Sequence, residues 1–292
     1  MPAELEPIER VGVVGCGLMG SGIAEVCARA GVDVVVREVD DAALAAGRSR
    51  LERSLARALS KGKLSDEAME AALGRLRYTT DMGELADRQL VLEAVSESEA
   101  LKLDVFATLD KVVADDAILA SNTSAIPIMK LAMATGRADR VVGLHFFSPV
   151  PVLKLVELVS SLLTSEETAQ AAKSFAEDVL DKRVIQSKDR AGFIVNALLI
   201  PYLVAAIRML ESGFATAEDI DTGMVLGCNH PMGPLALADF IGLDTTMAAA
   251  QSLYEEFKEP LYAPPPLLSR MVEAGLLGRK TGRGFYEHPG QR

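Results

Sequence analysis

The chain has 292 residues, enough for two domains of ordinary size. Hydrophobic residues make up 49% and charged residues 24%, a balance that excludes a disordered or fibrous protein. The formal net charge of −11 argues against a general nucleic-acid binder, so no nucleic-acid partner is expected. The three cysteines, Cys16, Cys27 and Cys228, form no CxxC pair, which predicts neither a disulfide framework nor a metal site.

The sequence gives no sign of export or membrane insertion. The N-terminal stretch MPAELEPIERVGVVG lacks the basic start and apolar run of a secretory signal. Residues 191–207 carry no charge, but they contain Asn196 and Pro201, so a buried helix is expected there rather than a membrane span. Together with unpaired cysteines, this pattern predicts a soluble cytoplasmic protein without a membrane partner.

The first part of the chain alternates short apolar runs with helical patterns. The predicted strands cover residues 11–14, 32–36, 89–94, 118–121 and 141–146, and 152–159 and 184–185 extend the same sheet. The predicted helices cover residues 21–30, 41–59, 65–74 and 104–113, with Asp40 and Asp41 as caps of the second. Strands that alternate with helices indicate the α/β class, here a Rossmann-like, mostly parallel sheet.

The pattern changes at residues 188–190. From residue 191 onward there is almost no strand signal, and helices are predicted over residues 193–210, 217–226, 234–257 and 266–274. This change predicts two domains. Residues 1–188 form a Rossmann-like nucleotide-binding domain, and residues 189–292 form an all-helical C-terminal domain.

The segment Gly15-Cys16-Gly17-Leu18-Met19-Gly20 joins the first predicted strand to the first predicted helix. This is the context of a dinucleotide site. Gly15 permits a tight turn, Gly17 leaves room for a pyrophosphate, and Gly20 lets helix and strand pack closely. The N-terminus of this helix offers free N–H groups to the phosphates, and Leu18 and Met19 of the turn are also predicted to contact the cofactor.

The preference between NAD and NADP depends on the residues at the end of the second predicted strand. Glu38 stands where a carboxylate binds the ribose hydroxyls, and its charge repels a 2′-phosphate, which favours NAD over NADP. Arg37 beside it keeps NADP as the less favoured alternative, since an arginine can serve a 2′-phosphate.

Two residues in apolar runs suggest proton transfer. His145 ends the run at 141–144, and the carboxyl ends of such strands face the ligand crevice. Glu157 lies within the run 152–159, where a carboxylate needs a partner. That partner is His145 or, as the alternative, Lys154 or a backbone group. A His–Glu pair suits a general base that removes a hydroxyl proton as hydride leaves for a nicotinamide. His230 is expected to be structural and His288 to be solvated.

Two neutral polar residues complete the candidate site. Ser124 follows the predicted strand at 118–121, and Asn196 lies within an apolar helix, where an unpaired amide is costly. Either side chain can hydrogen-bond a substrate oxygen. The alternatives are a turn residue for Ser124 and a satisfied core amide for Asn196.

These segments together resemble the L-3-hydroxyacyl-CoA dehydrogenase family, most closely its bacterial 3-hydroxybutyryl-CoA members. The match runs from about residue 10 to about residue 286 and includes GCGLMGSGIAEV, ASNTSA, VVGLHFFSP, PVLKLVELV, RAGFIVN, NHPMGPL, DFIGLD and GRKTGRGFY. The family commonly has asparagine at the positions of Ser98 and Ser148.

The resemblance implies NAD-dependent interconversion of (3S)-3-hydroxyacyl-CoA and 3-ketoacyl-CoA, with a short acyl chain. It implies that His145 is the catalytic base and Glu157 its partner, and that Ser124 and Asn196 contact the substrate's 3-oxygen. It assigns Glu97, Lys102 and Asn122 to the cofactor, and it implies a homodimer. Two alternatives stay open: a dehydrogenase of small free hydroxy acids, and a nucleotide-binding protein without turnover.

A basic segment provides a candidate site for the CoA phosphates. Residues 48–63 hold six arginines and lysines against one acid, Glu52. Arg50, Arg53, Arg57 and Lys61 share one helix face, while leucines at 51, 55 and 59 share another. Arg57, Lys61 and Lys63 are the predicted contacts. An ordinary solvated face is the alternative.

Overall fold

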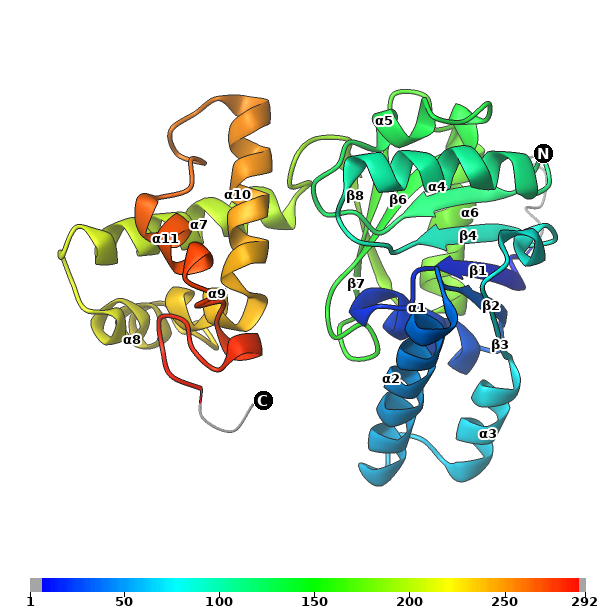
Figure 1. The fold of residues 1–292 in the computed structure, drawn as a ribbon, viewed down its shortest axis with the longest axis horizontal. Helices are drawn as coiled ribbons and strands as arrows, with labels where there is room; N and C mark the ends of the chain where they lie inside the picture. The colour runs from blue at the N-terminus through cyan, green and yellow to red at the C-terminus, as the bar shows by residue number, and fades with distance from the viewer. Residues whose placement is uncertain (1–6, 289–292) are drawn as a thin grey trace. The chain divides into compact units, whose positions relative to one another are not determined.

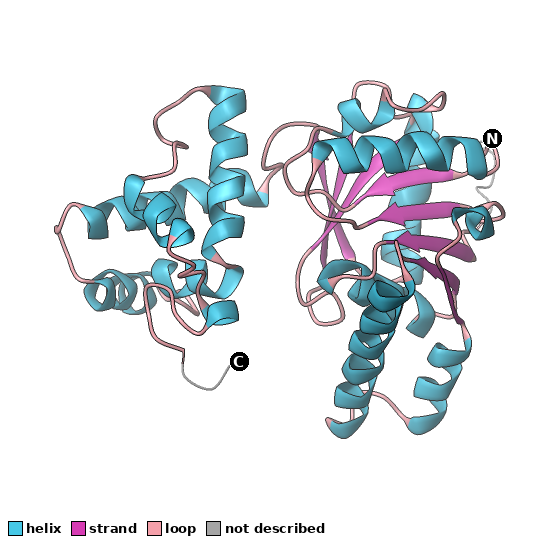
Figure 2. Cartoon of the chain, viewed as in Figure 1, coloured by secondary structure: helices cyan, strands magenta, loops and turns pink. Residues whose placement is uncertain are grey.

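The computed structural model describes residues 7–288, which divide into two compact units, one up to residue 190 and one from residue 191 (Figure 1). The first unit combines a sheet with helices, and the second unit is built from helices (Figure 2).

Within the described residues, the first unit holds one eight-stranded sheet with the order β3-β2-β1-β4-β5-β6-β7-β8. The strands are β1 (Arg10–Val14), β2 (Asp33–Arg37), β3 (Leu76–Thr79), β4 (Leu90–Glu93), β5 (Ile118–Ser121), β6 (Val141–Phe146), β7 (Leu155–Ser160) and β8 (Arg183–Lys188). All neighbours pair in parallel except β6 and β7, which are antiparallel. The first six strands follow the order of a dinucleotide-binding fold, so the predicted fold class is confirmed.

The helices of this unit are α1 (Leu18–Arg29), α2 (Asp41–Ser60), α3 (Asp66–Gly74), α4 (Glu99–Val112), α5 (Ile128–Ala132) and α6 (Glu166–Ser174), and α6 continues into the π-helical turn η3 (Phe175–Val179). Their starts follow the sequence. The Asp40 carboxylate accepts the Ala43 N–H at the start of α2, and the Ser65 hydroxyl accepts the Ala68 N–H at the start of α3.

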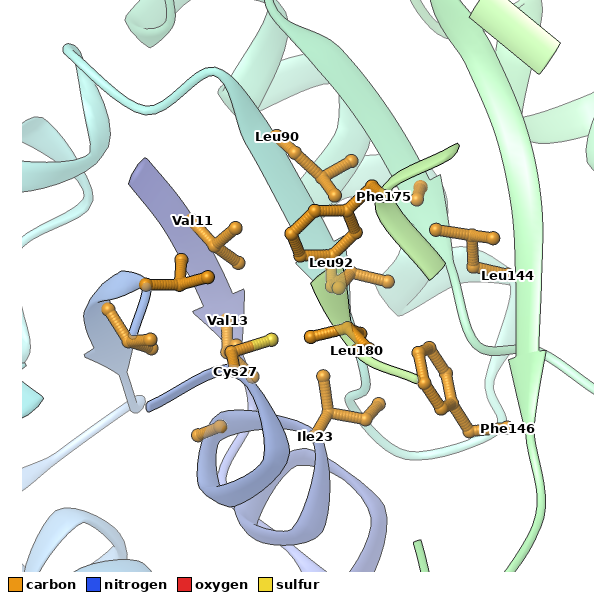
Figure 3. Close-up of a cluster of buried hydrophobic side chains, with 14 of the residues drawn as sticks. Val11, Val13, Ile23, Cys27, Leu90, Leu92, Leu144, Phe146, Phe175 and Leu180 are labelled. Carbon is orange, nitrogen blue, oxygen red and sulfur yellow. The ribbon is translucent and has the colours of Figure 1, made fainter. Parts of the chain in front are cut away.

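A core of apolar side chains holds the sheet against α1 and η3 (Figure 3). It joins side chains of the strands, of α1, of η3 and of the turn that follows η3: Val11, Val13, Leu90, Leu92, Leu144, Phe146, Ile23, Cys27, Phe175 and Leu180. Burying each large side chain of this kind stabilises the fold by about 1.5–3 kcal/mol. This packing fixes the strand ends from which the candidate site is built.

The second unit contains α7 (Val195–Glu211), α8 (Ala217–Cys228), α9 (Pro234–Ile241), α10 (Leu243–Phe257) and α11 (Pro266–Glu273). The single helix predicted over 234–257 is wrong. Two helices meet at Gly242, whose φ of 104° lies outside the helical region. Among residues 7–288, no helix has both the length and the apolar character that crossing a membrane requires.

A buried carboxylate organises the end of the second unit. Asp239 of α9 accepts the backbone N–H groups of Phe285 and Tyr286, each at 2.9 Å. Its Oδ2 also lies 2.9 Å from Nε2 of His288. The prediction that His288 is solvated is therefore wrong. The buried Asp239 carboxylate needs polar partners and binds the imidazole, and the His288 side chain is only 15% exposed. His230 contacts the Tyr202 hydroxyl.

Candidate active site

The glycine-rich turn lies at the carboxyl end of β1 and leads into α1. Gly15 has a φ of +90°, a conformation that other residues rarely adopt. A Cβ on Gly20 would lie 1.8 Å from the Gly15 carbonyl oxygen, whereas a Cβ on Gly17 would meet nothing within 4 Å. Gly17 is the N-cap of α1 and supplies no side-chain cap, so the helix N-terminus can take a pyrophosphate.

Glu38 directly follows β2, beside this turn. Its Oε1 accepts the Cys16 N–H at 2.5 Å, and its Oε2 accepts the Val39 N–H at 3.0 Å. The neighbouring Arg37 donates to the Thr80 carbonyl oxygen at 3.3 Å, which directs it toward the end of β3. The carboxylate thus stands at the position that suits the ribose hydroxyls of NAD. The open Gly17 position, the uncapped helix and this carboxylate together fit a dinucleotide.

His145 and Glu157 occupy facing positions on β6 and β7. Directly opposed residues of antiparallel strands carry their side chains on the same face of the sheet. Nδ1 of His145 lies 2.7 Å from Oε2 of Glu157, and the two residues are 7% and 0% exposed. The predicted contact is therefore present, and Lys154, the alternative partner, bonds Asp181 instead.

Two further side chains contact His145 or the connection between β6 and β7. The ring of Phe147 lies 4.5 Å from the imidazole, centroid to centroid. Lys182 donates to the carbonyl oxygens of Val150 and Leu153 at 2.6 and 2.8 Å. Burial lowers the pKa of Lys182. Neither Phe147 nor Lys182 stands out in the sequence by residue type or spacing.

A buried ionic network lies at the ends of β4 and β5. Nζ of Lys102 contacts Oε1 of Glu93 at 2.6 Å, Oε2 of Glu97 at 3.2 Å and the Val95 carbonyl oxygen at 3.3 Å. Ser121 donates to the other oxygen of Glu93 at 2.6 Å. Lys102 is only 1% exposed, and these three acceptors match its three donors. Its assignment to the cofactor stays a prediction. Glu93, an acid at the end of an apolar run, carries the same signal that singled out Glu157.

Glu97 extends this network to the Ser124 loop. Its Oε1 accepts the Thr123 hydroxyl at 2.5 Å and the Ser124 N–H at 3.0 Å. Asn122, at the start of the loop, accepts the Phe146 N–H at 2.8 Å, one residue after His145. The loop with Ser124 is therefore fastened both to the buried network and to β6.

The basic face of α2 is only partly as expected. Arg57, Lys61 and Lys63 are exposed, and Leu51 and Leu55 are fully buried on the opposite face. Arg50 departs from the face, because its guanidinium turns to the Cys16 carbonyl oxygen at 2.7 Å.

Asn196 belongs to the second unit, where it is half-buried in the first turn of α7. Its contact with substrate stays a prediction. Within residues 7–288, no group of three or more histidine, cysteine or acidic residues is arranged to hold a metal ion.

This fold and site define a dehydrogenase that uses a nicotinamide dinucleotide. Family models described as "3-hydroxyacyl-CoA dehydrogenase, NAD binding domain" and "3-hydroxyacyl-CoA dehydrogenase, C-terminal domain" match residues 10–190 and 192–288. The chain belongs to the 3-hydroxyacyl-CoA dehydrogenase family, which confirms the predicted resemblance and NAD as the cofactor.

Relatives match over nearly the whole chain. A Mycobacterium tuberculosis protein named 3-hydroxybutyryl-CoA dehydrogenase is 60% identical over 284 residues, 97% of this chain and 99% of that protein. The crystal structure of M. tuberculosis FadB2 is similar with a TM-score of 0.96, 60% identity and coverage of 97% and 99% of the two chains. That of (S)-3-hydroxybutyryl-CoA dehydrogenase PaaH1 from Ralstonia eutropha has a TM-score of 0.92, 47% identity and coverage of 96% and 99%.

Proposed function

We propose that this protein is an NAD-dependent enzyme that interconverts (3S)-3-hydroxyacyl-CoA and 3-ketoacyl-CoA, with 3-hydroxybutyryl-CoA as its short-chain substrate. The observation that carries the proposal is the 2.7 Å contact between His145 and Glu157. It lies at the carboxyl edge of the sheet whose first strand leads into the glycine-rich turn. A protein that only binds nucleotide has no need of this buried pair.

The pair performs proton transfer. Because Nδ1 of His145 faces the carboxylate, the imidazole tautomer is fixed and Nε2 is the ring atom that exchanges a proton with the 3-hydroxyl. Glu157 stabilises the imidazolium that forms. When bound, the nicotinamide supplies the hydride acceptor in oxidation and the hydride donor in reduction.

Ser124 and Asn196 hold the substrate's 3-oxygen in this proposal. The support for Ser124 is its place in the loop that Glu97 and Asn122 fasten beside β6. The support for Asn196 is its polar amide in the first turn of an apolar helix. Arg57, Lys61 and Lys63 attract the phosphates of the CoA nucleotide, since all three are exposed at the end of α2 and the turn that follows it.

A homodimer is also part of the proposal. The second unit exposes large apolar side chains, with Leu198 73%, Phe214 79% and Leu226 79% accessible. Exposed apolar groups of this size are typical of a surface that a partner subunit covers. Sedimentation as a monomer at micromolar concentration would contradict this. We place the enzyme in the cytoplasm on the basis of its unpaired cysteines.

The decisive test is the oxidation of NADH with acetoacetyl-CoA. The parent protein should turn over this substrate, and acetoacetate without CoA should react poorly. His145→Ala should lower kcat by about 10²–10⁴-fold while NADH binding is retained. Rapid reduction of the free acid would favour a dehydrogenase of small hydroxy acids. A loss below tenfold in His145→Ala would remove this residue from the mechanism.

A further inference from the structure

Helix α2 packs directly against the glycine-rich turn. A Cβ on Gly47 would lie 2.6 Å from both Cβ and Sγ of Cys16, so the helix approaches as closely as a glycine allows. One turn further along the helix, Nη1 of Arg50 lies 2.7 Å from the Cys16 carbonyl oxygen. Arg50 is half-buried, and this bond joins residues 34 positions apart. The contact is thus a specific link between α2 and the turn.

The direction of this bond matters for the cofactor. A trans peptide is planar, and its carbonyl oxygen and N–H point in opposite directions. Because Arg50 holds the Cys16 oxygen on the α2 side, the Gly17 N–H of the same peptide points to the other side. Glu38 holds the preceding peptide through the Cys16 N–H at 2.5 Å. Both peptides that flank the Cys16 α-carbon are therefore fixed by charged side chains.

We propose that Arg50 is a positioning residue for the dinucleotide: it holds the Cys16–Gly17 peptide so that the N–H groups at the start of α1 face the pyrophosphate. This inference rests on the proposed function, because that function makes a dinucleotide the ligand of the turn. A guanidinium suits the task, since it stays charged and donates in a fixed plane.

The test compares Arg50→Met with Arg75→Met in the full-length protein. Arg75 also donates to a backbone oxygen, that of Ala71 at 2.8 Å, but on α3 and away from the turn. Arg50→Met should raise the Kd for NADH by about tenfold, because binding must then order a peptide that the hydrogen bond from this charged donor no longer holds. Arg75→Met should leave it unchanged. Fluorescence titration with NADH measures both, and thermal unfolding reports the stability of each variant.

Fragments of the cofactor separate positioning from general loss of structure. ADP-ribose contains the pyrophosphate and should lose affinity for Arg50→Met as NADH does, while adenosine should bind as it does to the parent. Arg50→Lys keeps the positive charge but lacks the planar set of guanidinium donors, so it should recover part of the lost affinity for NADH. Equal affinity of the parent and Arg50→Met for NADH, or equal loss for adenosine and ADP-ribose, would overturn this inference alone. Absence of NADH binding by the parent would overturn the proposed function as well.

Discussion

At the scale of single residues, Glu157 is the proposed partner of the base His145. It is fully buried in β7, and its Oε2 faces Nδ1 of the imidazole. Glu157→Gln preserves the shape but removes the charge that stabilises the imidazolium in the proposed mechanism. We expect kcat to fall by about 100-fold with little change in the KM for NADH.

Steady-state rates with NADH and acetoacetyl-CoA measure this effect, and Glu70→Gln, which alters an exposed acid on α3, is the control. A Glu157→Gln variant with parental kcat would show that the carboxylate has no part in proton transfer.

The cysteines should differ in reactivity because they differ in burial. Burial raises the pKa of Cys16 to about 12, with a smaller contribution from the Glu38 carboxylate, and burial also raises the pKa of Cys27 to about 12. At pH 8 both side chains are therefore thiols rather than the nucleophilic thiolates. Cys228, at the end of α8, is exposed.

Iodoacetamide at pH 8 should consequently label the native protein once, at Cys228, and Cys228→Ser should prevent labelling. Peptide mass spectrometry identifies the site. Labelling of Cys16 in native protein at a rate similar to that of Cys228 would contradict the burial of this thiol against α2.

At the scale of elements, α2 combines two features that bear on ligand binding. Its middle contacts the glycine-rich turn through Gly47 and Arg50, and its end carries the exposed basic residues. Reversing two charges there, with Lys61→Glu and Lys63→Glu together, should raise the KM for acetoacetyl-CoA by about three- to tenfold at low salt, because exposed charges interact weakly and are screened.

The matched substrate is the pantetheine thioester, which lacks the CoA nucleotide and should show no change in KM. The matched variant is Lys111→Glu, an exposed lysine on α4. If both thioesters respond equally to the double reversal, these lysines do not bind the CoA phosphates.

Local sequence determined several elements well. The β-branched runs of β1, β2 and β6 and the caps at Asp40 and Ser65 are strong signals within a few residues of the chain. The strand β3 has the pattern Leu-Arg-Tyr-Thr, which lacks the continuous apolar run that marks β4 and β5 at the same length. The short helix α5 was also missed, since its five residues follow Pro127 without a full apolar period.

The candidate site was predictable where a charged residue lies within an apolar strand, because such a residue needs a partner. His145 and Glu157 lie twelve positions apart on adjacent strands, and a buried acid must find a donor. The pairing of Lys102 with Glu93, and of Arg50 with Cys16, depends instead on which elements become neighbours in space. The sheet places β4 between β1 and β5, an order that the strand patterns alone do not give.

At the scale of the whole molecule, each unit has its own core. In the second unit the core joins side chains of α7, α9, α10 and α11, among them Leu203, Ile207, Leu235, Leu243 and Leu268. The first unit is held by the cluster around Val11 and Phe146. A change within one core should therefore weaken that unit and leave ligand binding by the other intact.

Asp239 provides the test, because its buried carboxylate accepts the backbone N–H groups of Phe285 and Tyr286 and contacts His288. In Asp239→Asn an amide donor faces groups that also donate, so we expect a loss of about 2–4 kcal/mol in the free energy of unfolding of the second unit. The Kd for NADH, which the first unit binds, should not change. Thermal unfolding followed by circular dichroism, with NADH titration below the transition, measures both quantities.

Glu273→Gln, which alters an exposed acid paired with Arg270 on α11, is the control. A parental melting temperature in Asp239→Asn, or a matching loss of NADH affinity, would show that the carboxylate does not act as a local support of the helical unit.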